Sequence, residues 1–134
     1  MEPIIEPVAK EVLEAELKPE FFLRNTNNAG NLIYAVKANE APNIMREIGR
    51  LREQAFRMAG GGTGAELDID EDDLVDDGYT QLFVWDPVAM EILGGYRYII
   101  CDSPYQKHLS TEHYFRFSDK FRNEYLLNTI ELGR

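Results

Sequence analysis

The chain has 134 residues, a formal net charge of −10 and 44% hydrophobic residues. This length and this apolar share are typical of one folded domain. The negative charge argues against a protein that binds a bare phosphate backbone, because such a protein needs a basic surface. No stretch approaches the roughly 20 apolar residues that span a bilayer, and the acidic start does not resemble a signal peptide. We expect a cytoplasmic protein. It would be membrane-peripheral if it also touches the inner face of the membrane.

The first 40 residues predict a helix followed by a hairpin. Residues 7–17 favour a short helix that Pro19 closes, because four apolar residues share one face, Val8, Val12, Leu13 and Leu17. Residues 20–37 favour a hairpin, in which Asn and Gly residues form the turn between FFLR and LIYAVK. We interpret residues 1–40 as an N-terminal extension of a domain that fills residues 41–134.

The clearest helix is predicted for residues 42–58. Pro42 lies where a first-turn proline is tolerated, and the apolar residues follow helical spacing at Ile44, Ile48, Leu51, Ala55 and Met58. Arg52 lies beside this apolar face. The glycine-rich stretch 60–64 is predicted to end the helix. It is not a phosphate-binding loop, because it lacks Gly-Lys-Ser/Thr and follows a helix instead of a strand.

An acidic run follows at residues 66–77. It does not fit a calcium-binding EF-hand loop, because a loop starting at Asp68 would have Asp73 where glycine is required and Tyr79 where glutamate is required. Composition alone favours a solvated acidic loop here.

The remaining elements are strands. Residues 79–86 and 91–101 predict an antiparallel hairpin, residues 102–112 a loop, and residues 125–132 a last strand. Helix, hairpin, helix and a second hairpin in this order indicate an α+β fold with a mixed, largely antiparallel sheet and flanking helices.

Several charged residues stand in apolar surroundings. Arg97 lies within a predicted strand, Arg52 flanks an apolar helix face, and Glu131 lies between Ile130 and Leu132. Charges in such places are usually paired, because an isolated buried charge costs several kcal/mol. Two explanations stay open at this point: salt bridges that fix the sheet, or an electrostatic cluster that positions a substrate.

The cysteine and the histidines do not indicate a metal or redox site. Cys101 follows an apolar run and is expected to be a small buried residue. His108 and His113 have no third ligand at metal spacing, so we predict no metal site.

Taken in order, these residues resemble the autoinducer-synthase-like branch of the GNAT-fold N-acyltransferases, which includes acyl-homoserine lactone synthases and the N-acyltransferases of ornithine- and glycine-lipid synthesis. Many bacterial members carry the label "hemolysin". The motifs are Arg-x-x-x-Phe on a helix, Asp-x-x-Asp, Tyr, a strand Arg, and Glu-x-x-Arg. Here they are found at Arg52 and Phe56, Asp70 and Asp73, Tyr79, Arg97, and Glu131 and Arg134.

The resemblance implies the transfer of a fatty acyl group from acyl carrier protein or CoA to an amine, with no permanently bound cofactor. It implies Glu131 as the base, with Arg97, Asp70 and Asp73 as the other catalytic residues. Arg52, Phe56, Tyr79 and Arg134 would bind substrate. Backbone N–H groups of the final strand would hold the oxyanion, as in the wider fold.

This sequence departs from the lactone synthases in two ways that favour the lipid N-acyltransferases. Glycines replace a tryptophan after the helix, and the hairpin between Tyr79 and Arg97 is longer. A third difference concerns the end of the sequence, because the GNAT fold would continue after its fourth core strand. We therefore expect a missing C-terminal half or a second chain to complete the fold. This piece alone is expected to be inactive. The alternatives are a lactone synthase and a non-catalytic interaction domain. The acyltransferase interpretation requires the motif residues to meet at one cleft.

Overall fold

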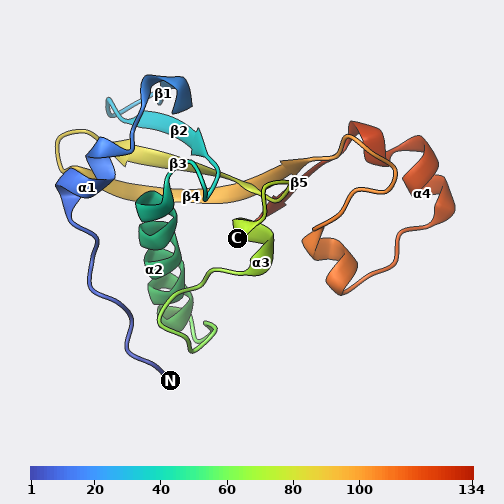
Figure 1. Ribbon diagram of the computed structural model, residues 1–134, viewed down its shortest axis with the longest axis horizontal. Helices are drawn as coiled ribbons and strands as arrows, with labels where there is room; N and C mark the ends of the chain where they lie inside the picture. Colours follow the sequence, from blue (N-terminus) through green and yellow to red (C-terminus); the bar gives the residue numbers. More distant parts are fainter.

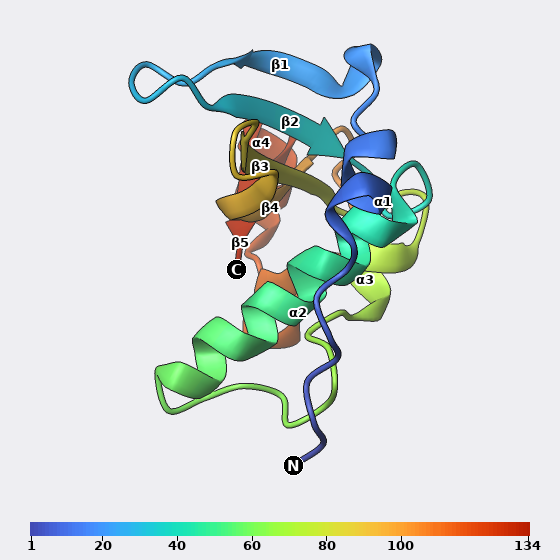
Figure 2. The same ribbon diagram turned by 90° about the vertical axis from the view of Figure 1, so that its left-hand side faces the viewer.

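A single antiparallel sheet organises the computed structural model, which describes residues 1–134 (Figure 1). Its five strands lie side by side in chain order, β1 to β5. Their bounds are Phe22–Asn25, Leu32–Val36, Thr80–Asp86, Glu91–Ile100 and Ile130–Gly133. Helices α1 (Lys10–Ala15), α2 (Pro42–Met58) and α3 (Glu71–Leu74) lie on one side of this sheet (Figure 2). The predicted α+β class is confirmed.

Alternation along the strands decides which face of the sheet is buried. In β3, Gln81, Phe83 and Trp85 are buried, and the residues between them are half-buried. The antiparallel register places Tyr34 of β2 opposite Phe83, and the two rings stack with their centroids 5.8 Å apart. Side chains at every second position share one face of a sheet, so this row faces α2.

Helix α2 supplies the other wall of the core. Pro42 occupies its first turn, as predicted, and the side chain of Glu16 accepts hydrogen bonds from the N–H groups of Asn43 and Ile44. Those N–H groups lack partners within the helix, so Glu16 caps α2 from the end of α1. The expected apolar face is wrong in its last turn, because Met58 is 81% exposed. There α2 extends past the sheet (Figure 1).

The N-terminal residues share this core. Leu13 of α1 and Tyr34 and Val36 of β2 belong to the same buried cluster as Phe83. The first helix is shorter than the predicted 7–17, because it begins at Lys10 and ends at Ala15. Residue Ala9 has extended backbone angles, and no side chain caps the helix start. These residues of the N-terminal segment therefore pack in the same core as the sheet and α2.

The acidic run is not a solvated loop as its composition suggested. It contains α3, and Asp68, Asp72 and Asp73 are buried. A capping box starts this helix, because the Asp70 side chain accepts from the Asp73 N–H and the Asp73 side chain accepts from the Asp70 N–H. The glycine stretch before it ends α2 as predicted, with Gly60, Gly62 and Gly64 at positive φ.

Residues 101–129 form an arm at the far end of the sheet (Figure 1). The arm contains short helical segments: Ser110–His113, α4 (Asp119–Glu124) and Leu126–Asn128. The predicted strand 125–132 is therefore wrong in its first half, because Leu126 turns inward to complete a second buried cluster. That cluster also holds Tyr79, Ile99, Leu109 and Cys101. The predicted burial of Cys101 is confirmed. No helix has the length and apolar character that crossing a membrane requires.

Two adjacent glycines in β4 give a test of the sheet. A Cβ at Gly95 would lie 2.3 Å from the Leu82 carbonyl oxygen and 2.9 Å from Phe83 Cα, whereas a Cβ at Gly94 meets nothing within 4 Å. We predict that Gly95→Ala lowers the free energy of unfolding by about 1–3 kcal/mol, the usual cost of overpacking. Urea denaturation measures this change. Gly94→Ala is the control and should be neutral; equal effects of the two changes would contradict the register.

Candidate active site

Three arginines and three aspartates from distant parts of the chain meet under the sheet. Arg52 comes from α2, Arg97 from β4 and Arg134 follows β5, while the carboxylates come from the segment leading into α3 and from α3 itself. Six contacts join them, between Arg52 and Asp73, Arg97 and Asp70, Arg97 and Asp73, Arg134 and Asp68, Arg134 and Asp70, and Asp70 and Asp73. Three positive and three negative charges balance, which makes their joint burial tolerable.

Asp73 lies at the centre of this cluster and is buried. It accepts from Arg52 at 3.1 Å, from Gln81 at 2.8 Å and from the Asp70 N–H at 3.2 Å, and lies 3.0 Å from Arg97. Gln81 also accepts from Arg52 at 2.5 Å. Since both carboxylate oxygens are engaged, Asp73 holds α2, β3, β4 and α3 together.

Arg97 links the cluster to the arm. Its guanidinium donates to Asp70 at 2.7 Å and to the Ser110 hydroxyl at 2.8 Å, and its Cζ lies 4.1 Å from the centre of the Tyr79 ring. Burial opposes the charged form, but the contacts with Asp70 and Asp73 outweigh it, so the pKa of Arg97 is raised. The buried Nε has no protein partner.

Asp70 and Arg134 form the accessible rim of the cluster. Their side chains are 33% and 27% exposed and contact each other. Burial acts to raise the pKa of Asp70, but the Arg97 hydrogen bond and charge overcome it, so that pKa is lowered and the group stays ionised. Asp68 is more deeply buried, and desolvation raises its pKa despite the charge of Arg134. A small charged ligand therefore reaches Asp70 before the buried carboxylates.

Glu131 lies on the same face of the sheet, one row beyond Arg97. Its Oε1 accepts from the Tyr79 hydroxyl and from the Ser110 N–H at 2.7 Å, and its Oε2 accepts only a long 3.3 Å bond from the Thr111 N–H. Burial, together with the hydrogen bond that the Tyr79 hydroxyl donates to Glu131, raises the pKa of Tyr79 to about 12. Tyr79 is therefore a neutral donor at physiological pH, and Oε2 keeps a free lone pair.

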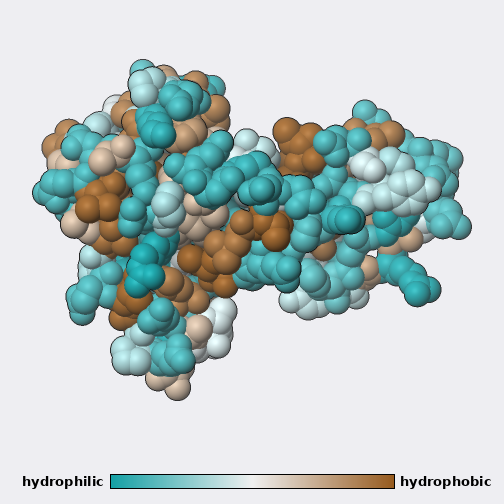
Figure 3. Space-filling view, viewed as in Figure 1, coloured by the Kyte–Doolittle hydropathy of each residue, from teal (hydrophilic) through white to brown (hydrophobic).

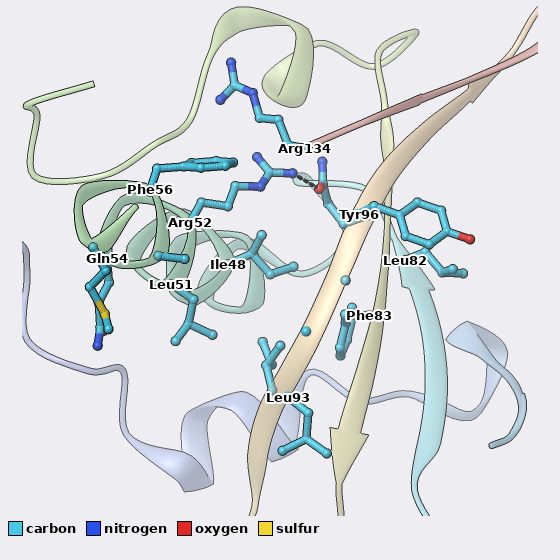
Figure 4. Close-up of a pocket in the computed structure, with 16 residues that line it drawn as sticks. Ile48, Leu51, Arg52, Gln54, Phe56, Leu82, Phe83, Leu93, Tyr96 and Arg134 are labelled. Carbon is cyan, nitrogen blue, oxygen red and sulfur yellow. Dashed lines mark hydrogen bonds between the residues drawn. The ribbon is translucent and has the colours of Figure 1, made fainter. Parts of the chain in front are cut away.

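An apolar groove opens beside the cluster, between α2 and β4 (Figure 4). Its volume is about 350 Å³, within the range of small-molecule sites. Phe56, Arg52 and Arg134 lie together at one end of it. The groove is thus continuous with the charged cluster.

The structure brings all eight motif residues into one connected region. Arg52, Asp70, Asp73, Arg97 and Arg134 form the cluster; Tyr79 and Glu131 join it through Ser110; Phe56 lines the groove. Sequence reasoning missed Gln81, Asp68 and Ser110. The available signal for Gln81 was a polar residue at a strand position that alternation predicts to face inward. Ser110 is brought to the site only by the fold.

The two histidines lie nearby but outside this cluster. His108 Nδ1 is 2.9 Å and His113 Nε2 is 3.1 Å from the two oxygens of Asp72. They tie the arm to α3.

The α+β sheet with its motif residues defines a GNAT-type domain, and the comparisons agree. The family described as "Acetyltransferase (GNAT) domain" matches residues 51–134, so the chain belongs to this family. The chain is 56% identical to a "Glycine N(alpha)-acyltransferase" of Bacteroides thetaiotaomicron and 53% identical to a protein of that name from Phocaeicola vulgatus. Both alignments cover 100% of this chain but 41% and 43% of the relatives. No solved structure matches significantly.

Removing the central carboxylate should destabilise the domain. We predict that Asp73→Asn lowers the free energy of unfolding by about 3–5 kcal/mol, because it leaves two buried guanidinium groups without their shared anion. Chemical denaturation at neutral pH measures this. Glu71→Gln, an exposed change in the same helix, is the matched control, and an equally small effect of both would show that the cluster does not hold the elements together.

The Tyr79 phenol offers a pH test. With a folded pKa of about 12 against an ordinary 10, its contribution to stability is complete below pH 10 and is lost between pH 10 and 12. NMR titration of Cζ-labelled tyrosines should show one resonance, absent in Tyr79→Phe, that titrates near pH 12. Glu131→Gln should lower that midpoint. Titration of Tyr79 near pH 10 in the native protein would disprove the hydrogen bond.

Proposed function

We propose that the protein carrying these residues is an N-acyltransferase that moves a fatty acyl group from a thioester to the amine of glycine, the first step of aminolipid synthesis. The observation that carries this proposal is the partly exposed Asp70–Arg134 pair beside an apolar groove. The names of the two relatives support glycine as the acceptor.

A glycine zwitterion matches this rim in charge. Its carboxylate would pair with the Arg134 guanidinium, which can hold a carboxylate in a bidentate fork. Its ammonium would pair with Asp70, which the lowered pKa keeps ionised. The buried Asp73 and Arg52 would fix both rim groups without contacting the substrate. We assign Arg97 to the same supporting role at the reacting centre.

Glu131 would remove the proton that blocks the attack. A free amino acid is mostly an ammonium ion at neutral pH, and only the neutral amine is a nucleophile. The free lone pair on Oε2 would take this proton, while Tyr79 and Ser110 hold Oε1 in place. The amine nitrogen then forms a bond to the thioester carbonyl carbon and the carbon–sulfur bond breaks. The proton that the nitrogen loses on becoming an amide is taken up by the thiolate, which leaves as a thiol. Backbone N–H groups on the free edge of β5 would stabilise the oxyanion.

We propose acyl carrier protein or CoA as the thioester donor. An acidic acyl carrier protein needs a local basic patch on a chain with net charge −10. The arm exposes three cations that form no salt bridge, Lys107, Arg116 and Lys120, although acidic residues such as Asp102 and Asp119 are exposed on it as well. It also exposes Tyr114 and Phe115. Exposed aromatic residues suit an interfacial contact, which supports a cytoplasmic, membrane-peripheral location for an enzyme with a lipid product.

Replacing Glu131 tests the chemistry. We predict that Glu131→Gln, in the natural polypeptide that carries this sequence, lowers kcat by about 10²–10⁴-fold while KM for glycine changes little, because a base acts in the chemical step. Formation of N-acylglycine from glycine and an acyl thioester, followed by mass spectrometry, measures both constants.

Glu124→Gln is the control, since Glu124 is exposed on α4. It should leave turnover unchanged. If Glu131→Gln retains native turnover across pH 6–9, Glu131 is not the base.

A further inference from the structure

The groove between α2 and β4 has two chemically different ends. Ten of its 16 lining residues are hydrophobic. Leu51, Phe83 and Leu93 lie toward one end of the groove, and Arg52 and Arg134 line the other end (Figure 4). Arg52 is held there by Asp73, whereas Arg134 is paired with Asp68 and Asp70 at the partly exposed rim. A site divided in this way suits a molecule with an apolar tail and an anionic head.

Both walls of the groove include residues with small side chains or none. On β4, Gly94 and Gly95 follow Leu93 and line the groove without side chains, and the space at Gly94 is open within 4 Å. On α2, Ala55 lies in the part of the helix that extends past the sheet and is exposed. Strand β5 pairs only with Arg97–Ile100, so it does not cover the other half of β4. An apolar channel therefore leads away from the charged rim.

We infer that this groove binds the acyl chain, with Ala55 and Leu93 setting the chain length that fits. The inference rests on the proposed function and assigns it the position of the tail. An N-acylglycine has one carboxylate joined to one linear hydrocarbon chain, which matches the guanidinium end and the apolar end in order. Each methylene that enters the groove should gain about 0.8 kcal/mol, which is roughly fourfold in affinity.

A chain-length series tests this assignment. Calorimetry would measure the binding of N-acylglycines with eight to fourteen acyl carbons, below their micelle concentrations, to the natural polypeptide. We expect affinity to rise about fourfold per methylene until the groove is full and then to level off. Ala55→Trp should move that plateau to shorter chains, and Leu93→Ala should move it to longer ones.

The control is Ala15→Trp, the same exchange at an exposed position of α1 that does not line the groove. It should leave the plateau unchanged. A plateau that is the same in Ala55→Trp, Leu93→Ala and the native protein would overturn the inference.

Acyl transfer measured in the same variants separates the two proposals. If the groove assignment alone is wrong, the native protein still forms N-acylglycine and Ala55→Trp keeps the native preference for acyl length. If the proposed function is wrong, no variant forms N-acylglycine from any donor, while a plateau that shifts with Ala55→Trp would still show a tail-binding groove. If both are right, Ala55→Trp lowers kcat/KM for long donors at least tenfold and spares short ones.

Discussion

The buried carboxylate of Asp73 is the interaction on which the rest of the structure depends. A lone charge at this depth would cost several kcal/mol, and Asp73 avoids that cost only because Arg52, Arg97 and Gln81 reach it at once. Each of these residues comes from a different element. The same requirement therefore fixes α2 against β3 and β4, and places α3 so that its capping residue, Asp70, faces Arg97.

This arrangement separates structural charges from charges that a substrate can reach. Asp73, Arg52 and Arg97 are buried and hold one another, whereas Asp70 and Arg134 remain partly exposed. Glu131 is joined to them through Ser110 and Tyr79 and not by a direct contact with an arginine. The groove extends from the rim in the opposite direction. An acceptor, a base and an acyl tail would therefore have separate places around one centre.

The sequence predicted those parts of the fold in which the hydrophobic periodicity agrees with the residues that start or end an element. Helix 42–58 is correct to the residue, because a first-turn proline and a glycine stretch mark its ends. Its last turn was assigned to the core wrongly, since periodicity cannot show where a helix outruns its sheet, as at Met58. The prediction of a solvated loop for the acidic run, which rested on composition, was also wrong. Asp68, Asp72 and Asp73 look solvated until their partners, which lie far away in sequence, are known. The eight residues of the ordered motifs lie together in the structure, and their roles stay predictions. The positions of Gln81, Asp68 and Ser110 beside them became visible only in the fold.

The choice of acceptor amine is the property that the Asp70–Arg134 rim should control. The natural polypeptide would receive an acyl thioester and equal amounts of isotopically labelled glycine, ornithine and homoserine lactone, and mass spectrometry would identify every acylated amine. We expect N-acylglycine as the main product, and its loss when Arg134→Ala removes the carboxylate partner at the rim. Acylation of another amine in preference to glycine, or full N-acylglycine formation by Arg134→Ala, would contradict this expectation.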